Sequence, residues 1–379
     1  MKKYDAVIVG GGAAGSMCAL TAKGKDVAIL DAGSRIAKKL MVTGNGRCNL
    51  TNQNINSSFY NTDLEKFFDR FDNKKTLNFF EKLGLETYAD DEGRIYPLSN
   101  TAKSVVDVIE NNVSCEMFLN EKVENVSHKN GTFYIKTGNQ SFEAPKLVLA
   151  IGGRCEWCFD DLGLKYSKFR PSLVGLQNKE TRDLNGVRLS NVKVTAKTLG
   201  GQEKTEVGEV QFRENGLSGI VVFNMSSLFA REDNYSGEIY IDLLPQLSEE
   251  QIEEKIKRRK NSSLKLDKMF VGMFHNAVAN EVFKQSKINT NKECQNLTDI
   301  EAQKLAHAIK FLHFSVCGAC ENNQIYAGGI ELKDLTDTLE SKQIKGLYVV
   351  GEAVNVDGVC GGYNLQWAWT SGHIVGEQL

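Results

Sequence analysis

A glycine-rich segment near the start of the chain has the residue types and spacing that bind a dinucleotide. Residues 10–15 fit the pattern G-x-G-x-x-G, follow the apolar run 6–9 and precede a helix-forming stretch, and Asp31 ends the next apolar run. In this context the first glycine permits a tight turn, the second admits a pyrophosphate, and the third lets a helix pack on a strand. We expect Asp31 to bond a ribose hydroxyl. The residues expected to hold the pyrophosphate at the helix N-terminus are Gly10, Gly12, Ala13, Ala14 and Gly15.

Two further polar segments with repeated glycines favour FAD over NAD. Residues 38–52 contain hydroxyl, amide and cationic groups where a NAD-binding chain would continue with a helix. Residues 351–366 contain a strand-end acid, Glu352, and a Gly-Gly turn whose N–H groups can face a flavin ring that gains negative charge on reduction. The other expected cofactor contacts are Lys39, Thr43, Gly44, Gly46, Arg47, Cys48, Asn49, Val123, Ala150, Gly152, Gly351, Gly362, Tyr363, Asn364 and Leu365.

Two of these residues are also the candidate catalytic groups. Tyr363 can donate a proton or orient a carbonyl group, and Arg47 can hold phosphate or substrate charge. The G-x-G-x-x-G pattern occurs once, so we expect no separate NAD(P)H domain, and NAD(P)H would act as a transient electron donor.

Two C-x-x-C pairs lie among the nine cysteines: Cys155 with Cys158, and Cys317 with Cys320. Four thiolates could hold a zinc ion or an iron–sulfur cluster. One pair alone could be a redox dithiol. The remaining interpretation, which we favour, is coincidence, with no metal bound.

The elements that must position these groups can be read from apolar spacing. Short apolar runs at 4–9, 27–30, 146–151 and 347–350 predict buried parallel strands. Helices are predicted over 13–23, 64–83, 102–110 and 363–376, strands across 171–245, and helices across 248–313. This order predicts a nucleotide-binding domain built from both chain ends, with an insertion between them.

Composition and charge exclude several classes of protein. Hydrophobic residues make up 41% and charged residues 25%, as in folded globular domains. The net charge of −2 does not favour nucleic acid as a partner, and the basic run 255–260 follows glutamates with which it can pair along a helix. No apolar run is long enough to span a membrane, and the run at 6–9 ends in glycines instead of a cleavage site, so we expect a cytoplasmic protein.

These segments resemble a family of bacterial FAD flavoproteins that includes aminoacetone oxidase-like proteins and the bile-acid-inducible flavin reductase. Residues 10–15, 39–52, 93–97 and 346–372 carry the resemblance most clearly. The resemblance implies an α/β fold with non-covalently bound FAD. It implies a Rossmann-type domain over 1–160 and 325–379, an inserted antiparallel β-barrel over 161–246 and 314–324, and a helical cap over 247–313. The chain departs from the family pattern at both C-x-x-C pairs.

We therefore expect an FAD-dependent oxidoreductase that transfers hydride to a small molecule, reducing an activated C=C bond of an apolar, steroid-like substrate. An amine oxidase acting on an aminoacetone-like substrate is the first alternative. A flavoprotein redox sensor or metal-binding module that uses the two cysteine pairs is the second. An RNA-modifying flavoenzyme is disfavoured by the charge. The sequence indicates no oligomeric state.

Overall fold

The computed structural model describes residues 1–22, 26–260 and 263–379, which form two compact units. Unit 1 comprises Met1–Arg170 and Ile325–Leu379, and unit 2 comprises Pro171–Gln324. Segment 247–313, expected to form a separate cap, falls in unit 2 with the strands that flank it. The three-part division stays a prediction.

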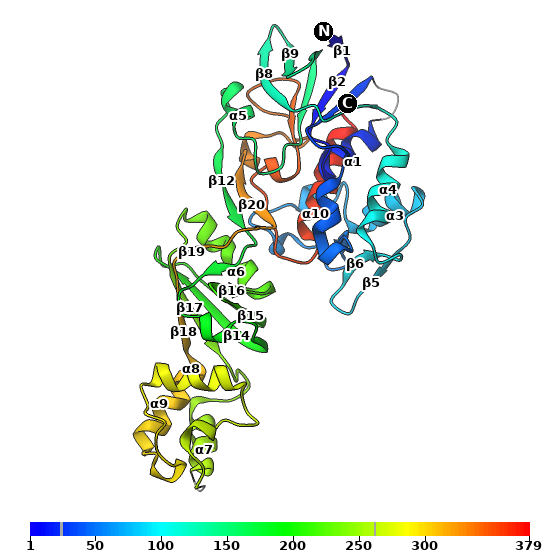
Figure 1. Ribbon diagram of the computed structural model, residues 1–379. Helices are drawn as coiled ribbons and strands as arrows, with labels where there is room; N and C mark the ends of the chain where they lie inside the picture. The colour runs from blue at the N-terminus through cyan, green and yellow to red at the C-terminus, as the bar shows by residue number, and fades with distance from the viewer. Residues whose placement is uncertain (23–25, 261–262) are drawn as a thin grey trace. The chain divides into compact units, whose positions relative to one another are not determined.

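A parallel five-stranded sheet forms the centre of unit 1 (Figure 1). Four of its strands are short, mostly apolar and buried, which is typical of a parallel sheet covered on both faces, and the edge strand β7 is partly exposed. The predicted α/β Rossmann-type fold is confirmed. In spatial order the strands are β21 (Leu347–Val349), β11 (Lys146–Leu149), β2 (Ala6–Val9), β3 (Val27–Asp31) and β7 (Glu116–Leu119).

Helices α1 (Ala13–Thr21) and α10 (Tyr363–Gly376) lie side by side although they come from opposite ends of the chain (Figure 1). Two glycines of α10 make this approach close. A Cβ atom on Gly372 would lie 2.4 Å from the backbone oxygen of Ala14, and one on Gly376 would lie 2.6 Å from that of Cys18. The backbones of the two helices therefore touch, and this contact aligns the glycine turns that precede them.

Smaller sheets and helices complete unit 1. A four-stranded sheet has the order β1 (Lys2–Lys3), β10 (Ser141–Ala144), β9 (Thr132–Thr137) and β8 (Val123–Lys129). A three-stranded sheet has the order β4 (Thr51–Asn52), β6 (Arg94–Pro97) and β5 (Thr87–Ala89). A third sheet pairs β12 (Ser167–Ser172) with β20 (Ile325–Gly329). The helices are α2 (Glu65–Phe68), α3 (Asn73–Lys82), α4 (Ala102–Asn112), α5 (Trp157–Asp161) and the 3-10 segments η1 (Lys38–Gly46), η2 (Ser57–Phe59), η6 (Leu332–Asp334) and η7 (Gly351–Ala353).

The helix predicted over 64–83 is wrong in one respect, since the structure has two helices there. Helix α2 ends at Phe68, with Asp69 as its C-cap. Asp72 caps the start of α3, its side chain accepting a hydrogen bond from the N–H of Lys75 at 2.8 Å. Aspartate favours this capping role over a helix interior because its oxygen competes for backbone N–H groups. The apolar residues keep helical spacing across this break, so the sequence pattern predicted one continuous helix.

Unit 2 contains an antiparallel seven-stranded sheet with its own apolar core. Its order begins with β18 and ends with β19, two segments that only Cys317 separates in the chain. The predicted barrel itself stays a prediction. The strands in spatial order are β18 (Leu312–Val316), β17 (Gly237–Asp242), β14 (Arg188–Thr198), β15 (Glu203–Arg213), β16 (Gly216–Ser218), β13 (Leu176–Gln177) and β19 (Gly318–Ala319).

One helix of unit 2 was missed by the strand-rich interpretation of 171–245. Helix α6 (Ile220–Arg231) begins with the apolar run Ile-Val-Val-Phe, which periodicity alone cannot assign to strand or helix. Its apolar side packs on the antiparallel sheet. The other helices are α7 (Glu249–Arg259), α8 (Asn276–Ser286), α9 (Asp299–Lys310) and the 3-10 segments η3 (Arg182–Leu184), η4 (Leu266–Lys268) and η5 (Cys294–Asn296).

Candidate functional site

The glycine turn between β2 and α1 is tightly constrained at two positions. Gly10 has φ +102°, and a Cβ atom there would lie 2.3 Å from the backbone oxygen of Ala150. A Cβ atom on Gly15 would lie 1.9 Å from the backbone oxygen of Gly10. Both glycines are therefore needed by the fold itself, one for the turn and one for the approach of helix to strand.

Gly12 differs from its neighbours because nothing lies within 4 Å of a Cβ atom built on it. It is the N-cap of α1, its φ of −68° suits any residue, and no side chain caps the helix. The first N–H groups of an α-helix have no intrahelical partners and carry partial positive charge. Open space beside such donors fits a phosphate group, so the residues present match the implied cofactor.

Asp31 ends β3 and is tied to the glycine turn. Its two carboxylate oxygens accept hydrogen bonds from the N–H groups of Gly11 at 2.7 Å and Gly33 at 2.6 Å. An ionised carboxylate has about four acceptor sites, so two remain for the hydroxyls of a ribose. The side chain therefore shapes the turn as well as being a candidate ribose ligand.

Glu352 and Lys39 are 313 residues apart in sequence and meet in space, with 3.3 Å between Lys39 Nζ and Glu352 Oε2. The other carboxylate oxygen of Glu352 accepts a hydrogen bond from the N–H of Tyr326 at 2.6 Å. Gly152 adjoins them, since a Cβ atom there would lie 3.5 Å from Glu352 Oε2. Three predicted cofactor contacts from three segments thus gather at one place. Tyr326 was not predicted, because its contribution is a backbone N–H group and carries no side-chain signal.

Helix α10 holds the turn that carries Glu352. The indole of Trp367 donates a hydrogen bond to the oxygen of Gly351 at 3.0 Å, and the Ser371 hydroxyl accepts one from the N–H of Gly351 at 2.9 Å. Both side chains are fully buried. Helix α10 therefore determines where Glu352 lies. The sequence pattern of this helix predicted that these side chains are buried, but not that they bond to Gly351.

The Gly-Gly turn before α10 packs on the segment around residue 50. Gly361 and Gly362 have φ values of +125° and +97°, and a Cβ atom on Gly362 would lie 2.5 Å from the oxygen of Thr51. Asn52, which we did not predict as a site residue, donates a hydrogen bond from Nδ2 to the oxygen of Gly361 at 3.0 Å. The side-chain amide of Asn49 is oriented so that its oxygen accepts a hydrogen bond from the N–H of Gly362 at 3.1 Å.

Asn364 has a structural role that sequence reasoning did not foresee. Its amide accepts a hydrogen bond from the N–H of Gly358 at 2.9 Å and donates to the oxygen of the same residue at 2.8 Å. The side chain thus closes the loop before α10. Contact with a cofactor would come from the backbone N–H group of Asn364.

The two candidate catalytic side chains lie in different surroundings. Tyr363 is 6% exposed and packs between Phe59 and Tyr60, and burial raises the pKa of its hydroxyl. Arg47 is partly exposed, with its guanidinium carbon 4.3 Å from the centre of the Tyr96 ring. Stacking holds the planar cation in place. Two of its N–H groups donate long hydrogen bonds, Nε to the oxygen of Gly44 at 3.4 Å and Nη2 to the Tyr96 hydroxyl at 3.5 Å.

The remaining predicted contacts are mostly backbone groups of unit 1. Cys48 is fully buried with φ +61°, and burial raises the pKa of its thiol to about 12, so it acts as a small apolar group. Thr43 donates a hydrogen bond to the oxygen of Leu40 at 2.8 Å. The other positions are Ala13 and Ala14 at the start of α1, Gly44 and Gly46 within η1, Val123 at the start of β8, Ala150 after β11, and Leu365 in the first turn of α10.

The two cysteine pairs belong to different units. Cys155 and Cys158 lie in unit 1, whereas Cys317 and Cys320 lie in unit 2. Across residues 1–22, 26–260 and 263–379, no group of three or more His, Cys, Asp or Glu side chains is arranged to hold a metal ion. None of the helices in these ranges combines the length and apolar content that a membrane span needs.

Comparison with known proteins assigns the chain to a family. A model of the HI0933-like protein Rossmann domain matches residues 4–378. A 3-dehydro-bile acid delta(4,6)-reductase of Clostridium scindens is 33% identical, with 98% of this chain and 97% of that protein aligned. Ribosomal RNA dihydrouridine synthases of Haemophilus influenzae and Escherichia coli are 26% and 27% identical over at least 98% of each chain. The chain therefore belongs to the HI0933-like family of Rossmann-fold, FAD-dependent oxidoreductases.

Proposed function

We propose that the chain reduces a carbon–carbon double bond conjugated with a carbonyl group. The observation that carries this proposal is a shared reaction class among relatives with unlike substrates. A bile-acid delta(4,6)-reductase and a dihydrouridine synthase both saturate a C=C bond, one in a steroid and the other in a pyrimidine ring of RNA. The common element is hydride addition to an activated double bond.

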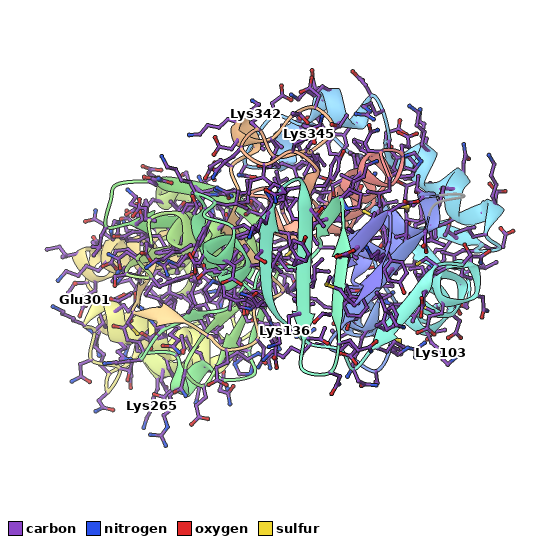
Figure 2. All side chains as sticks on the ribbon, turned by 90° about the horizontal axis from the view of Figure 1, so that it is seen from above. Lys103, Lys136, Lys265, Glu301, Lys342 and Lys345 are labelled. Atoms are coloured by element: carbon purple, nitrogen blue, oxygen red, sulfur yellow. The ribbon has the colours of Figure 1, made fainter. Side chains whose placement is uncertain are left out.

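A small, apolar, steroid-like substrate is favoured over RNA. The reductase is the more similar relative, and the net charge of −2 provides no excess of cations for a polyanion. Among the lysines of unit 1 labelled in Figure 2, Lys103 is on α4 and Lys136 on β9, whereas Lys342 and Lys345 lie in the segment between η6 and β21. Two members of the basic run pair within α7, Lys257 with Glu253 and Arg258 with Glu254, and Lys260 pairs with Asp299 of α9. These pairings support a solvated helix face.

The residues proposed to hold FAD without a covalent link all belong to unit 1. The N–H groups at the start of α1 would bind the pyrophosphate beside Gly12, and Asp31 would bind the adenosine ribose. Glu352 and Lys39 would contact the part of the cofactor between pyrophosphate and flavin. The N–H groups at the start of α10 would face the ring, where helix-terminal positive charge favours the reduced state.

Bound FAD, once reduced by NADH or NADPH, would supply the hydride that adds to one carbon of the double bond. The neighbouring carbon then needs a proton. Tyr363 is the proposed donor, because a tyrosine hydroxyl is protonated at neutral pH and can give its proton to the substrate. Burial raises its pKa further. Arg47, held against Tyr96, would orient the substrate carbonyl and stabilise the negative charge that develops on its oxygen.

The test is an anaerobic two-step reduction with the purified holoenzyme. NADH or NADPH should bleach the flavin, and a 3-oxo steroid with a conjugated double bond should restore its colour and gain two hydrogen atoms. Tyr363→Phe should slow the second step by roughly 10²–10⁴-fold, the usual contribution of a general acid, and leave the first unchanged.

The same preparation separates the alternatives. Ribosomal RNA that re-oxidises the flavin where the steroid does not would indicate the nucleic-acid substrate. Bleaching by aminoacetone without NAD(P)H would indicate an amine oxidase. A bleached flavin that neither acceptor re-oxidises would overturn the proposal.

A further inference from the structure

The two C-x-x-C pairs have the same sequence spacing, but the first encloses a turn and the second an extended strand. Cys155 and Cys158 enclose a hydrogen-bonded turn, in which the N–H of Cys158 donates to the oxygen of Cys155 at 3.1 Å. Such a turn places its first and fourth Cα atoms less than about 7 Å apart. Disulfides join Cα atoms about 4.4–6.8 Å apart, so this pair meets the distance requirement.

The second pair does not meet it. Gly318–Ala319, the strand β19, lies between Cys317 and Cys320 and pairs with β13. An extended chain rises about 3.3 Å per residue, which separates the two Cα atoms by roughly 10 Å. The sulfur of Cys320 is also packed 3.2 Å from a Cβ position built on Gly175. Cys317 and Cys320 therefore serve as an internal control, with the same sequence spacing but a geometry that does not allow a disulfide.

The first pair also has the asymmetry expected of an attacking and a resolving thiol. Cys158 is completely buried, whereas Cys155 is partly exposed. Burial raises the pKa of both thiols, and at Cys155 this rise is opposed by Lys122, by a hydrogen bond with Trp157 and by Arg154. The charge of a Cys155 thiolate further raises the pKa of Cys158, and that of Cys317 does the same to Cys320. The exposed cysteine is therefore the more nucleophilic of the two.

We propose that Cys155 and Cys158 form a reversible redox disulfide by exchange with low-molecular-weight disulfides. The Cys155 thiolate attacks one sulfur of the disulfide RSSR, forming a mixed disulfide and releasing the thiolate RS⁻. The Cys158 thiol then loses its proton and attacks the sulfur of Cys155, releasing the second RS⁻. Overall, two cysteine thiols and RSSR give one protein disulfide and two RSH. The proposal does not depend on the function proposed above.

The chain's own trypsin sites allow a direct test. Cleavage after Arg154 and Lys165 isolates a peptide, 155–165, that contains only the first pair, and cleavage after Lys310 and Lys333 isolates 311–333 with only the second. The native holoenzyme is equilibrated with oxidised glutathione or with dithiothreitol, then denatured, alkylated with iodoacetamide, digested with trypsin and analysed by mass spectrometry. After treatment with oxidised glutathione, peptide 155–165 should carry no alkyl group and have the mass of the reduced peptide minus two hydrogen atoms. Dithiothreitol should restore both alkylation sites, and peptide 311–333 should show no internal disulfide in either buffer.

Single substitutions test the order of attack. Cys158→Ser should trap one glutathione on Cys155, whereas Cys155→Ser should leave Cys158 unmodified in the native protein. The double variant Cys317→Ser/Cys320→Ser should leave the 155–158 disulfide unchanged. Two alkylated sites on peptide 155–165 in oxidised glutathione would overturn the proposal. So would a stable mixed disulfide on wild-type Cys155, or a disulfide forming equally in peptide 311–333.

Discussion

At the scale of single residues, the glycine turn contains glycines that the fold requires and one that only a bound ligand would require. Gly10 and Gly15 meet backbone atoms within 2.3 Å of where a Cβ would stand. Gly12 meets nothing within 4 Å. A side chain at position 12 would therefore be tolerated by the protein and would intrude only on what binds there.

Gly12→Val should abolish flavin retention and leave the apoprotein folded. The valine would occupy the space beside the first N–H groups of α1, and FAD affinity should fall by more than about tenfold. Gly15→Val is the matched control and should destabilise the apoprotein itself by about 1–3 kcal/mol or more, because it forces overpacking against backbone. Visible flavin absorbance and thermal unfolding of the two apoproteins distinguish the effects. Equal loss of stability in both variants would contradict the assignment.

Asp31→Ala should weaken FAD binding by about 1.5–3 kcal/mol, the range for hydrogen bonds to a charged group. It should also lower the melting temperature of the apoprotein, because the N–H groups of Gly11 and Gly33 lose their acceptor. Asp31→Asn retains one side-chain oxygen and should fall between the wild type and the alanine variant in both measurements. Titration of the apoproteins with FAD, beside calorimetric melting, tests this. Unchanged FAD affinity in Asp31→Ala would rule out ribose contact.

At the scale of elements, α10 determines the geometry of the site. Its start presents the Gly-Gly turn, its buried Trp367 and Ser371 hold Gly351, and its two later glycines touch α1. Displacement of this helix would therefore move the strand-end acid and both helix N-termini together.

Gly372→Val should destabilise the protein by about 1–3 kcal/mol through overpacking against Ala14. Flavin retention should fall in parallel, because the same shift moves both glycine turns. Gly138→Ala is a suitable control, since the nearest atom to its Cβ position is the end of the Glu124 side chain at 3.5 Å. Denaturant unfolding of the two variants measures the difference. Wild-type stability in Gly372→Val would show that the helices can separate without cost.

His373 should make α10 sensitive to acid. Its ring stacks on Phe71 with centres 3.9 Å apart, and burial lowers its pKa below the ordinary value of about 6.5. As the pH falls below about 6.5, the unfolded chain takes up a proton before the folded protein does, so stability is lost, at most about 1.4 kcal/mol per pH unit. His373→Phe keeps the aromatic packing and should reduce the loss of melting temperature between about pH 7.5 and 5.5. An unchanged pH dependence would count against this contribution.

At the scale of the whole molecule, every proposed FAD contact belongs to unit 1, although these residues come from both ends of the chain. Unit 2 has a separate apolar core and a separate sheet. The cofactor should therefore act on the stability of one unit, through linkage between binding and folding.

Addition of FAD to the apoprotein should slow hydrogen exchange in β2, α1 and the start of α10, and leave the β14–β15 hairpin unchanged. At a hundredfold excess over the dissociation constant the stabilisation should be about 2.7 kcal/mol. Exchange followed peptide by peptide with mass spectrometry measures both units in one sample. Equal protection of β14–β15 would show that flavin binding is not confined to unit 1.

The sequence alone determined the cofactor-binding frame of this protein. The strand, glycine turn and helix at residues 6–21 and the closing helix at 363–376 follow from local rules, because buried strands, glycines and helix starts each leave a local pattern. The resemblance to a known family added the prediction of an inserted β-rich part, and the family itself is confirmed.

Only the tertiary structure decided which residues meet. It joined Lys39 to Glu352, assigned the Asn364 side chain to its own loop, and gave two identical cysteine spacings a turn in one unit and a strand in the other. It also made α6 a helix and divided 64–83 at Asp72. These outcomes depend on contacts between distant segments and on backbone conformation. Residue type and spacing constrain such contacts weakly, because the same short sequence can satisfy its hydrogen bonds in more than one way.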